Sequence, residues 1–181
     1  MTDELRVERL DAPGAAAALP GLGALLADAV ASGASVGFLP PLAPEDARAY
    51  WEDVVASLRD GGRVLLAARS GGELVGSVQL ILEPRANGGH RAEVAKLLVH
   101  SSRRRRGIGR RLMEALEREA AREGRTTLVL DTRQGDPSEA LYRGMGYQVA
   151  GTIPRYARSA DGSLHATVFM YKLLPLGENR P

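Results

Sequence analysis

The hexapeptide Arg104-Arg105-Arg106-Gly107-Ile108-Gly109 joins a strand-like run at residues 94–99 to a helix-like run at residues 110–123. Two glycines at such a junction allow a tight turn and leave backbone N–H groups uncovered. The N–H groups that open the helix then point at one spot, where the helix dipole favours an anion. Arginine side chains beside that spot can add bidentate contacts to a phosphate. The stretch therefore predicts a strand-to-helix turn that holds a phosphate-bearing cofactor.

Three kinds of cofactor loop can be compared with this turn. A nucleoside-triphosphate loop needs four residues between its glycines and then Lys-Ser or Lys-Thr, but only Ile108 separates Gly107 from Gly109. A dinucleotide turn needs a small residue where this chain has Leu112. The third pattern, Gln/Arg-x-x-Gly-x-Gly/Ala, is met by Arg104 and the two glycines. It resembles the acetyl-CoA pyrophosphate loop of the GCN5-related N-acetyltransferase (GNAT) family.

A run of arginines also occurs in nucleic-acid-binding proteins. Aromatic residues make up only 4% of the chain, and none lies near the run to stack on bases. The formal net charge of +2 gives little long-range attraction to a polyanion. A basic nucleic-acid-binding module is therefore the weaker hypothesis, and we expect no nucleic-acid partner.

The composition is that of an ordinary globular protein. Of 181 residues, 44% are hydrophobic and 25% are charged, which fits a single domain over residues 1–181. The absence of cysteine excludes disulfides, thiolate metal sites and a cysteine nucleophile. Three dispersed histidines do not indicate a metal site. The acidic start is unlike a signal peptide, and no apolar run could span a bilayer. We expect a cytoplasmic protein without a metal or a membrane partner.

Periodicity and turn signals predict the order of elements. Ser70-Gly71-Gly72 marks a hairpin, while Gly124 and Gly146 end helices. The four-residue spacing of Leu112, Leu116 and Ala120 gives the helix after the glycine turn a buried stripe. We predict helices at residues 15–32, 44–60, 110–123 and 138–145, the first of them interrupted early by Pro20. We predict strands at residues 5–10, 63–69, 73–83, 91–99, 126–131, 147–153 and 165–174, with loops at 33–43, 84–89 and 154–164.

This order, and a second motif, resemble the GNAT family over residues 3–174. The segment at residues 141–147, Leu-Tyr-Arg-Gly-Met-Gly-Tyr, is similar to the family's Leu-Tyr-x-x-x-Gly-Phe/Tyr. The resemblance implies an α/β (α+β) fold with a mixed, mostly antiparallel sheet of about seven strands and helices on both faces. Residues 90–171 look most like the tabtoxin-resistance type, which acetylates an amino-acid toxin. The implied activity is acetyl-CoA-dependent transfer to the amine of a small molecule, by direct attack in a ternary complex.

The resemblance also implies which residues hold acetyl-CoA. Backbone groups of the fourth strand would pair with the pantetheine arm and supply an oxyanion donor, and the glycine turn would hold the pyrophosphate. The family often has Asn seven residues before the tyrosine, where this chain has Gly135. The cofactor-binding residues that we predict are Leu97, Leu98, Val99, Arg104, Arg105, Arg106, Gly107, Ile108, Gly109, Arg110, Ser138 and Tyr142.

Acetyl transfer also needs a proton acceptor for the amine and a proton for the thiolate. Glu93 interrupts an apolar strand and Asp131 ends a short parallel-type strand, so we predict that one or both serve as the base. Purely structural roles are the alternative: Glu93 could pair with Arg91 or Lys96, and Asp131 could cap a turn. Tyr142, protonated at neutral pH, is the predicted acid, or else a residue that only packs against the cofactor.

The three loops should determine the acceptor. From them and their borders we predict Phe38, His90, Tyr156 and His165 as substrate-binding residues, although both histidines also fit ordinary loop edges. A non-catalytic CoA-binding sensor of the same fold is the main alternative to an enzyme. The sequence allows a monomer or a homodimer.

Overall fold

The computed structural model describes residues 4–175. Five α-helices are formed: α1 (Ala12–Ala17), α2 (Leu19–Ala31), α3 (Pro44–Arg59), α4 (Ile108–Arg122) and α5 (Pro137–Gly144). Two short 3-10 turns lie at Ala86–Gly88 and Ser101–Arg103. The strands are β1 (Arg6–Leu10), β2 (Arg63–Ser70), β3 (Glu73–Leu82), β4 (Arg91–Val99), β5 (Thr127–Arg133), β6 (Gln148–Arg158) and β7 (Leu164–Leu173).

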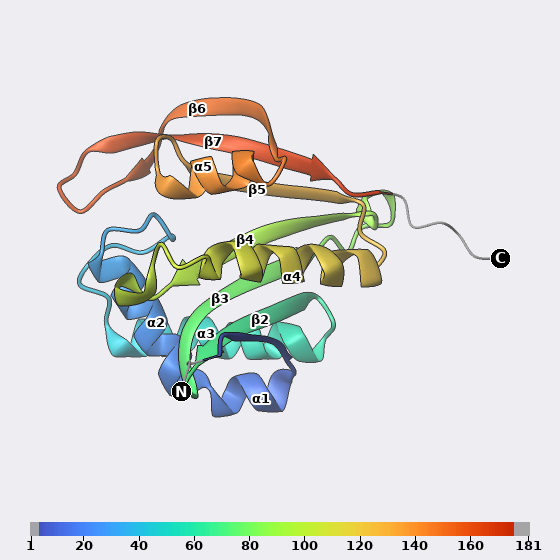
Figure 1. The fold of residues 1–181 in the computed structure, drawn as a ribbon. Coiled ribbons are helices and arrows are strands. Elements are labelled where there is room, and N and C mark those ends of the chain that lie inside the picture. The colour runs from blue at the N-terminus through green and yellow to red at the C-terminus, as the bar shows by residue number, and fades with distance from the viewer. Residues whose placement is uncertain (1–3, 176–181) are drawn as a thin grey trace.

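All seven strands belong to one sheet in the order β1-β2-β3-β4-β5-β7-β6. Every neighbouring pair is antiparallel except β4 and β5, which run parallel. The parallel pair is connected through α4, as a crossover between parallel strands requires. Figure 1 shows the sheet with helices on both sides. The predicted fold class, a mostly antiparallel seven-stranded sheet covered by helices, is confirmed.

Two hydrophobic cores lie on opposite faces of the sheet. On the α3 face, helices α1, α2 and α3 pack against residues such as Leu65, Ala67 and Leu98. On the α4 face, helices α4 and α5 pack against residues such as Val64 and Leu66. Strand β2 is apolar without interruption at its centre because its two sets of alternating side chains fill both cores.

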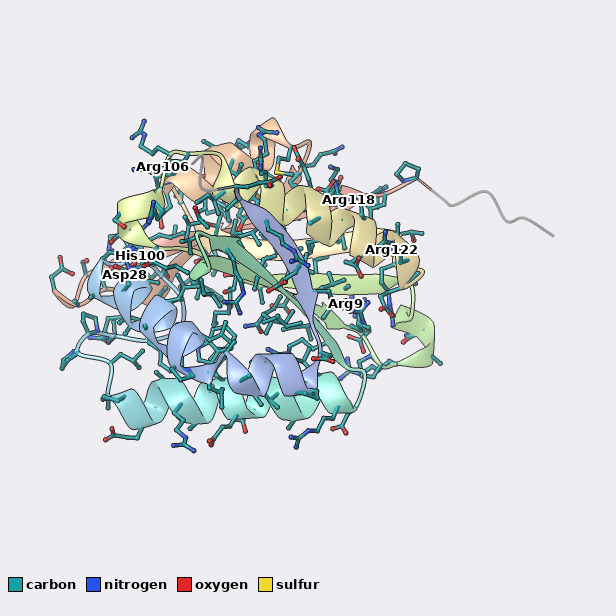
Figure 2. All side chains as sticks on the ribbon, turned by 60° about the horizontal axis from the view of Figure 1, so that its bottom comes forward. Arg9, Asp28, His100, Arg106, Arg118 and Arg122 are labelled. Carbon is teal, nitrogen blue, oxygen red and sulfur yellow. The ribbon has the colours of Figure 1, made fainter. Side chains whose placement is uncertain are left out.

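Helix α4 lies across the sheet on the stripe that its sequence predicts. Leu112, Leu116 and Ala120 are fully buried there. Glu119 shares this buried stripe, and its carboxylate accepts hydrogen bonds from Arg9 on β1 (2.9 Å) and from Arg122. Figure 2 shows Arg9 reaching toward the end of α4 that carries Arg122. This charged cluster fastens the edge strand β1 to the C-terminal half of α4.

Two elements differ from the sequence prediction. The helix expected at residues 15–32, with an early interruption at Pro20, is two helices that begin three residues sooner. Asp11 caps the first (its Oδ1 accepts from Gly14 N–H at 2.8 Å), and Pro20 sits in the first turn of the second. The strand expected to end at Ile153 continues to Arg158. Pro154 is tolerated because β6 is an edge strand, which pairs only with β7.

Within residues 4–175, none of the helices is both long enough and apolar enough to cross a membrane.

Replacing Arg9 by Met should lower the free energy of unfolding by about 1–2 kcal/mol, because Glu119 would lose one of its two cationic partners inside a buried stripe. Urea denaturation would measure this. Arg48→Met is the matched control, since it removes an exposed arginine from an ion pair with Glu52 within α3, and should leave the midpoint unchanged. Equal effects of the two substitutions would contradict a structural role for the Arg9 cluster.

Candidate active site

The sheet divides between β4 and β5. These strands pair at only three positions, Arg91 with Thr127, Ala92 with Leu128 and Glu93 with Val129. Beyond these three positions, β4 remains paired with β3 and β5 remains paired with β7. Residues 94–99 and 130–133 therefore present strand edges to each other without pairing. We call this opening the split, and its unpaired N–H and C=O groups are available to a ligand.

A β-bulge lies in β4 beside the split. Gln79 of β3 pairs with Ala95 and Ser77 pairs with Leu98, so Lys96 and Leu97 both stand opposite Val78. Lys96 has a left-handed backbone with φ of 50°. A bulge bends its strand and increases the local twist, which favours the departure of β4 from β5. The side chains of Leu97 and Val99 pack against the α4-face core, so along this stretch the backbone faces the split.

The glycine turn follows β4 on the α4 face. Gly107, with φ of 78°, is the N-cap of α4, and Arg105 is also left-handed. The first N–H of α4 that bonds back into the helix is that of Arg111, which donates to Gly107 O at 3.1 Å. The N–H groups of Ile108, Gly109 and Arg110 precede it and need an outside acceptor. This arrangement fits a phosphate group, as the sequence predicts.

The two glycines of the turn serve different purposes. A Cβ on Gly107 would have no atom within 4 Å, so its requirement is the positive φ. A Cβ on Gly109 would lie 3.4 Å from Leu141 Cδ2 and 3.9 Å from Leu97 Cδ2. Gly109 therefore lets the first turn of α4 approach α5 and β4 closely, at the edge of the split.

The consecutive arginines are also unlike one another. Arg104 lies along the protein surface, where its Nε donates to Val99 O (3.2 Å) and its Nη2 to Ser32 Oγ (2.6 Å). Arg105, Arg106 and Arg110 are exposed and, within residues 4–175, form no ion pair with an acidic side chain. These three remain available to a phosphate, whereas Arg104 braces the turn.

Asp28 of α2 braces the same turn from the other side. Its carboxylate accepts from Ser101 N–H (2.7 Å) and Ser101 Oγ–H (2.6 Å), and His100 lies beside it (Figure 2). Burial opposes the charge of Asp28, but the hydrogen bonds from Ser101 outweigh it, so the pKa of Asp28 is lowered. The turn is thus held at a set position relative to α2.

The two predicted bases lie on the α3 face of the split. Ala92 and Val94 are buried in the α4-face core, so Glu93 between them points the other way, and Asp131 does so after Leu130. Both carboxylates are exposed in the open split. Even so, partial burial raises the pKa of Asp131, and the positive charge of Lys96 only partly offsets this.

Tyr142 lies on the α4 face, opposite the two carboxylates. It belongs to the α4-face core, and the residue is only 6% exposed. Burial, reinforced by the negative charge of Asp131, raises the pKa of Tyr142 above its usual value. The phenol therefore keeps its proton throughout the neutral range. Ser138, in the first turn of α5, is held by a 2.7 Å hydrogen bond to Thr132 Oγ1.

The four predicted acceptor-binding residues are not all near the split. Phe38 packs edge-on against Tyr50 of α3, with ring centroids 5.6 Å apart. Tyr156 packs edge-on against Phe169, which is paired with Asp131 in the sheet. His90 instead precedes β4, at the end remote from the glycine turn, and His165 contacts Ser163 (2.8 Å) in the β6–β7 hairpin. Phe38 is thus linked through Tyr50 to Lys96, and Tyr156 through Phe169 to the strand position of Asp131. Among residues 4–175, neither histidine forms a hydrogen bond or ion pair with Glu93 or Asp131.

Several residues that shape the α3 face of the split were not predicted. They are Tyr50, Lys96, Phe169 and Arg133, whose guanidinium contacts Asp136, Ser159 Oγ and Gly33 O. Lys96 had a signal in the sequence, since it is one of two lysines and stands in an apolar run. The others have none, because they reach the site only through tertiary packing. Within residues 4–175, no group of three or more histidine and acidic residues could hold a metal ion.

A split sheet with an N–H-lined turn on one face and ionisable groups on the other is the arrangement expected of an enzyme that takes a group from a phosphate-bearing cofactor. The chain belongs to the acetyltransferase (GNAT) family, whose model matches residues 27–147, more than half of the chain. It is an N-acetyltransferase with acetyl-CoA as its cofactor.

Individual relatives agree with this assignment. An uncharacterized N-acetyltransferase of Azospirillum brasilense is 35% identical over 59% of this chain and 63% of its own. An L-methionine sulfoximine/L-methionine sulfone acetyltransferase of Pseudomonas paraeruginosa is 26% identical over 87% of this chain and 90% of its own. The fold is similar to a Brucella melitensis ribosomal-protein-alanine N-acetyltransferase (TM-score 0.78, 27% identity, 93% and 99% of the chains covered). A Salmonella typhimurium protein solved with its cofactor acetyl-CoA has the same fold (TM-score 0.78, 20% identity, 98% of both chains covered).

Replacing Gly107 by Ala should weaken acetyl-CoA binding by about tenfold and lower stability by about 1–2 kcal/mol, because a side chain disfavours the left-handed backbone that directs the N–H groups. Calorimetric titration and urea denaturation would measure the two effects. Gly61→Ala is the control, since Gly61 also has a positive φ with open space around it, in the α3–β2 connection. It should lose similar stability and bind acetyl-CoA normally. Unchanged affinity in Gly107→Ala would argue against the phosphate site.

Proposed function

We propose that this chain transfers the acetyl group of acetyl-CoA to the amine of a small molecule, by direct attack in a ternary complex. The observation that carries the proposal is the split itself. It has an N–H-lined turn on its α4 face and two carboxylates, Glu93 and Asp131, on its α3 face. Two ligands can therefore meet in it from opposite sides without either one blocking the other.

The cofactor fits the residues that line the split. Backbone groups of residues 97–99 suit the amides of the pantetheine arm, and the N–H groups of residues 108–110 suit the pyrophosphate. The exposed Arg105, Arg106 and Arg110 can neutralise phosphate charge. When bound, acetyl-CoA supplies the acetyl group as a reactive thioester. The unpaired N–H groups of β4 are also available to a carbonyl oxygen held in the split.

Asp131 and Glu93 would attract the acceptor's ammonium and take up its proton. An α-amine has a pKa of about 8 and a lysine-like amine about 10.4, so either arrives mainly protonated. The raised pKa of Asp131 brings it closer to that of the amine, which improves it as a proton acceptor. Tyr142, which stays protonated, would donate to the departing thiolate from the α4 face.

We propose that the acceptor is amino-acid-like, and that the enzyme is of the tabtoxin-resistance type. The support is the similarity to enzymes named for L-methionine sulfoximine and L-methionine sulfone. We further propose a single domain over residues 1–181, a cytoplasmic location, and a monomer or homodimer without nucleic-acid partners. A non-catalytic CoA sensor is the competing function. Thiol release from acetyl-CoA with a panel of amines tests between them, since a sensor would release none.

Activity should fall on the acid side of neutrality at a higher pH than an ordinary aspartate would give. Asp131 accepts a proton only when ionised, and its pKa is raised, so lowering the pH protonates it early. In Asp131→Asn, kcat/KM should drop about 100-fold and this acid limb should disappear, with acetyl-CoA affinity retained. Glu93→Gln is the paired variant, which shows whether Glu93 shares the role. Full activity in both variants from pH 6 to 9 would place the base elsewhere.

Tyr142→Phe should reduce turnover at pH 7 by about 10- to 1,000-fold, because the ring and its packing remain while the proton donor is lost. The loss should shrink above about pH 8.5, where a thiolate leaves without needing a proton. A pH profile of kcat and a melting curve of both proteins would test this. Wild-type turnover at pH 7 would mean that Tyr142 only packs in the core.

A further inference from the structure

Lys96 occupies the bulge of β4 in a backbone conformation that few residues other than glycine adopt, with φ of 50°. Adjacent side chains of the bulge point in different directions. Leu97 packs into the α4-face core, whereas the Lys96 side chain crosses the α3 face toward α3. Non-glycine residues held at positive φ are concentrated at functional sites. The bulge thus carries a cation to the side of the split from which an acceptor would enter.

Within the described part of the chain, no carboxylate lies within ion-pair distance of the Lys96 ammonium. Its Nζ lies 5.5 Å from the centroid of the Tyr50 ring and 3.6 Å from the place that a Cβ on Gly37 would take. Among residues 4–175 it makes no hydrogen bond and no ion pair within 4.0 Å. Burial and the nearby Arg63 lower the pKa of Lys96, while Asp131 and Glu93 act in the opposite direction. A half-buried cation without a partner can accept an anionic ligand.

The aromatic ring beneath this cation is firmly held. Tyr50 OH donates to Gln79 Oε1 at 3.2 Å, and Arg63 also donates to Gln79 Oε1. Gln79 is fully buried, and the ring of Tyr50 packs edge-on against Phe38 on one side and Trp51 on the other. A fixed ring keeps the ammonium at a set position through a cation–π contact, which leaves its N–H donors free for a ligand.

We propose that Lys96 binds a carboxylate of the acceptor, and that the acceptor is therefore an α-amino acid or an analogue with a carboxylate beside its amine. The charges on the α3 face are arranged for such a molecule, with the carboxylates of Glu93 and Asp131 for the ammonium and Lys96 for the carboxylate. An acceptor with several amines and no carboxylate would bring a cation against Lys96 and Arg63, which disfavours it. This inference rests on the function proposed above.

The test compares α-amino acids, including L-methionine sulfone, with their carboxamides, which keep the amine and lose the negative charge. With wild-type protein, kcat/KM should favour the acid over its amide by about 10- to 100-fold, mainly through KM. Lys96→Met should bring the acid down to the level of the amide and change the amide by less than about threefold. Lys96→Arg, which keeps the charge, should restore part of the preference.

The other lysine of the chain provides a matched control. Lys172 Nζ pairs with Glu117 at 2.7 Å, away from the split, so Lys172→Met should leave the preference for acids intact. Equal losses on acids and amides in Lys96→Met would overturn the proposal, because Lys96 would then only offset the charge of Asp131 and Glu93. A wild-type protein without preference for acids would overturn it as well.

A binding experiment distinguishes failure of the proposed acetyl transfer from failure of the proposed carboxylate site. If wild-type protein acetylates no member of the panel, calorimetric titration of the same pairs into CoA-loaded protein still tests Lys96. Binding of an acid that is at least tenfold tighter than that of its amide, and that is lost in Lys96→Met, would support the carboxylate site. Equal binding of acid and amide, or no binding of either, would refute it.

Discussion

Three residue pairs of parallel sheet hold β4 beside β5, and the rest of the molecule is arranged around the point where that pairing stops. A sheet normally gains by extending its ladder, since each unpaired backbone group that is shielded from water costs free energy. Here the bulge at Lys96 turns β4 toward β3, while the first turn of α4 and the side chain of Leu141 meet beside Leu97. The strands are kept apart by packing on the α4 face, and the open edges stay accessible.

The alternation of side chains along a strand then divides the chemistry between the two faces. Leu130 fills the α4-face core, and the next residue, Asp131, necessarily faces the other way. Tyr142 approaches the same opening from α5, within the electrostatic reach of Asp131. The phenol that we propose as proton donor and the carboxylate that we propose as proton acceptor thus lie on opposite faces of the split. Tyr142 keeps its proton beside Asp131, because burial and the negative charge of Asp131 raise the pKa of the phenol.

The sequence predicts those features of the fold and the site that depend on residues close together in the chain. The glycine turn, the buried stripe of α4 and the succession of strands are predicted from local patterns, and the structure agrees with them. The bulge has no local signature, because one extra residue in an apolar run leaves the run looking like a strand. The extension of β6 past Pro154 was missed for a related reason: a proline ends a central strand but not an edge strand, and edge position is a property of the whole sheet. Tyr50 and Phe169 join the site only through contacts between distant elements.

The arginine run shows why composition alone is a poor guide to a charged surface. Arg103 lies 3.4 Å from Glu73, and Arg104 is bonded to Val99 O and Ser32. Among the residues the structure describes, only Arg105 and Arg106 of the four form neither an ion pair nor a side-chain hydrogen bond. Half of the run is therefore structural, and it fixes the turn whose N–H groups converge at the helix end. An anion bound there is recognised first by backbone geometry, and the remaining arginines add charge to a site that already exists. That order favours one compact phosphate group over an extended polyanion, which needs a continuous basic surface.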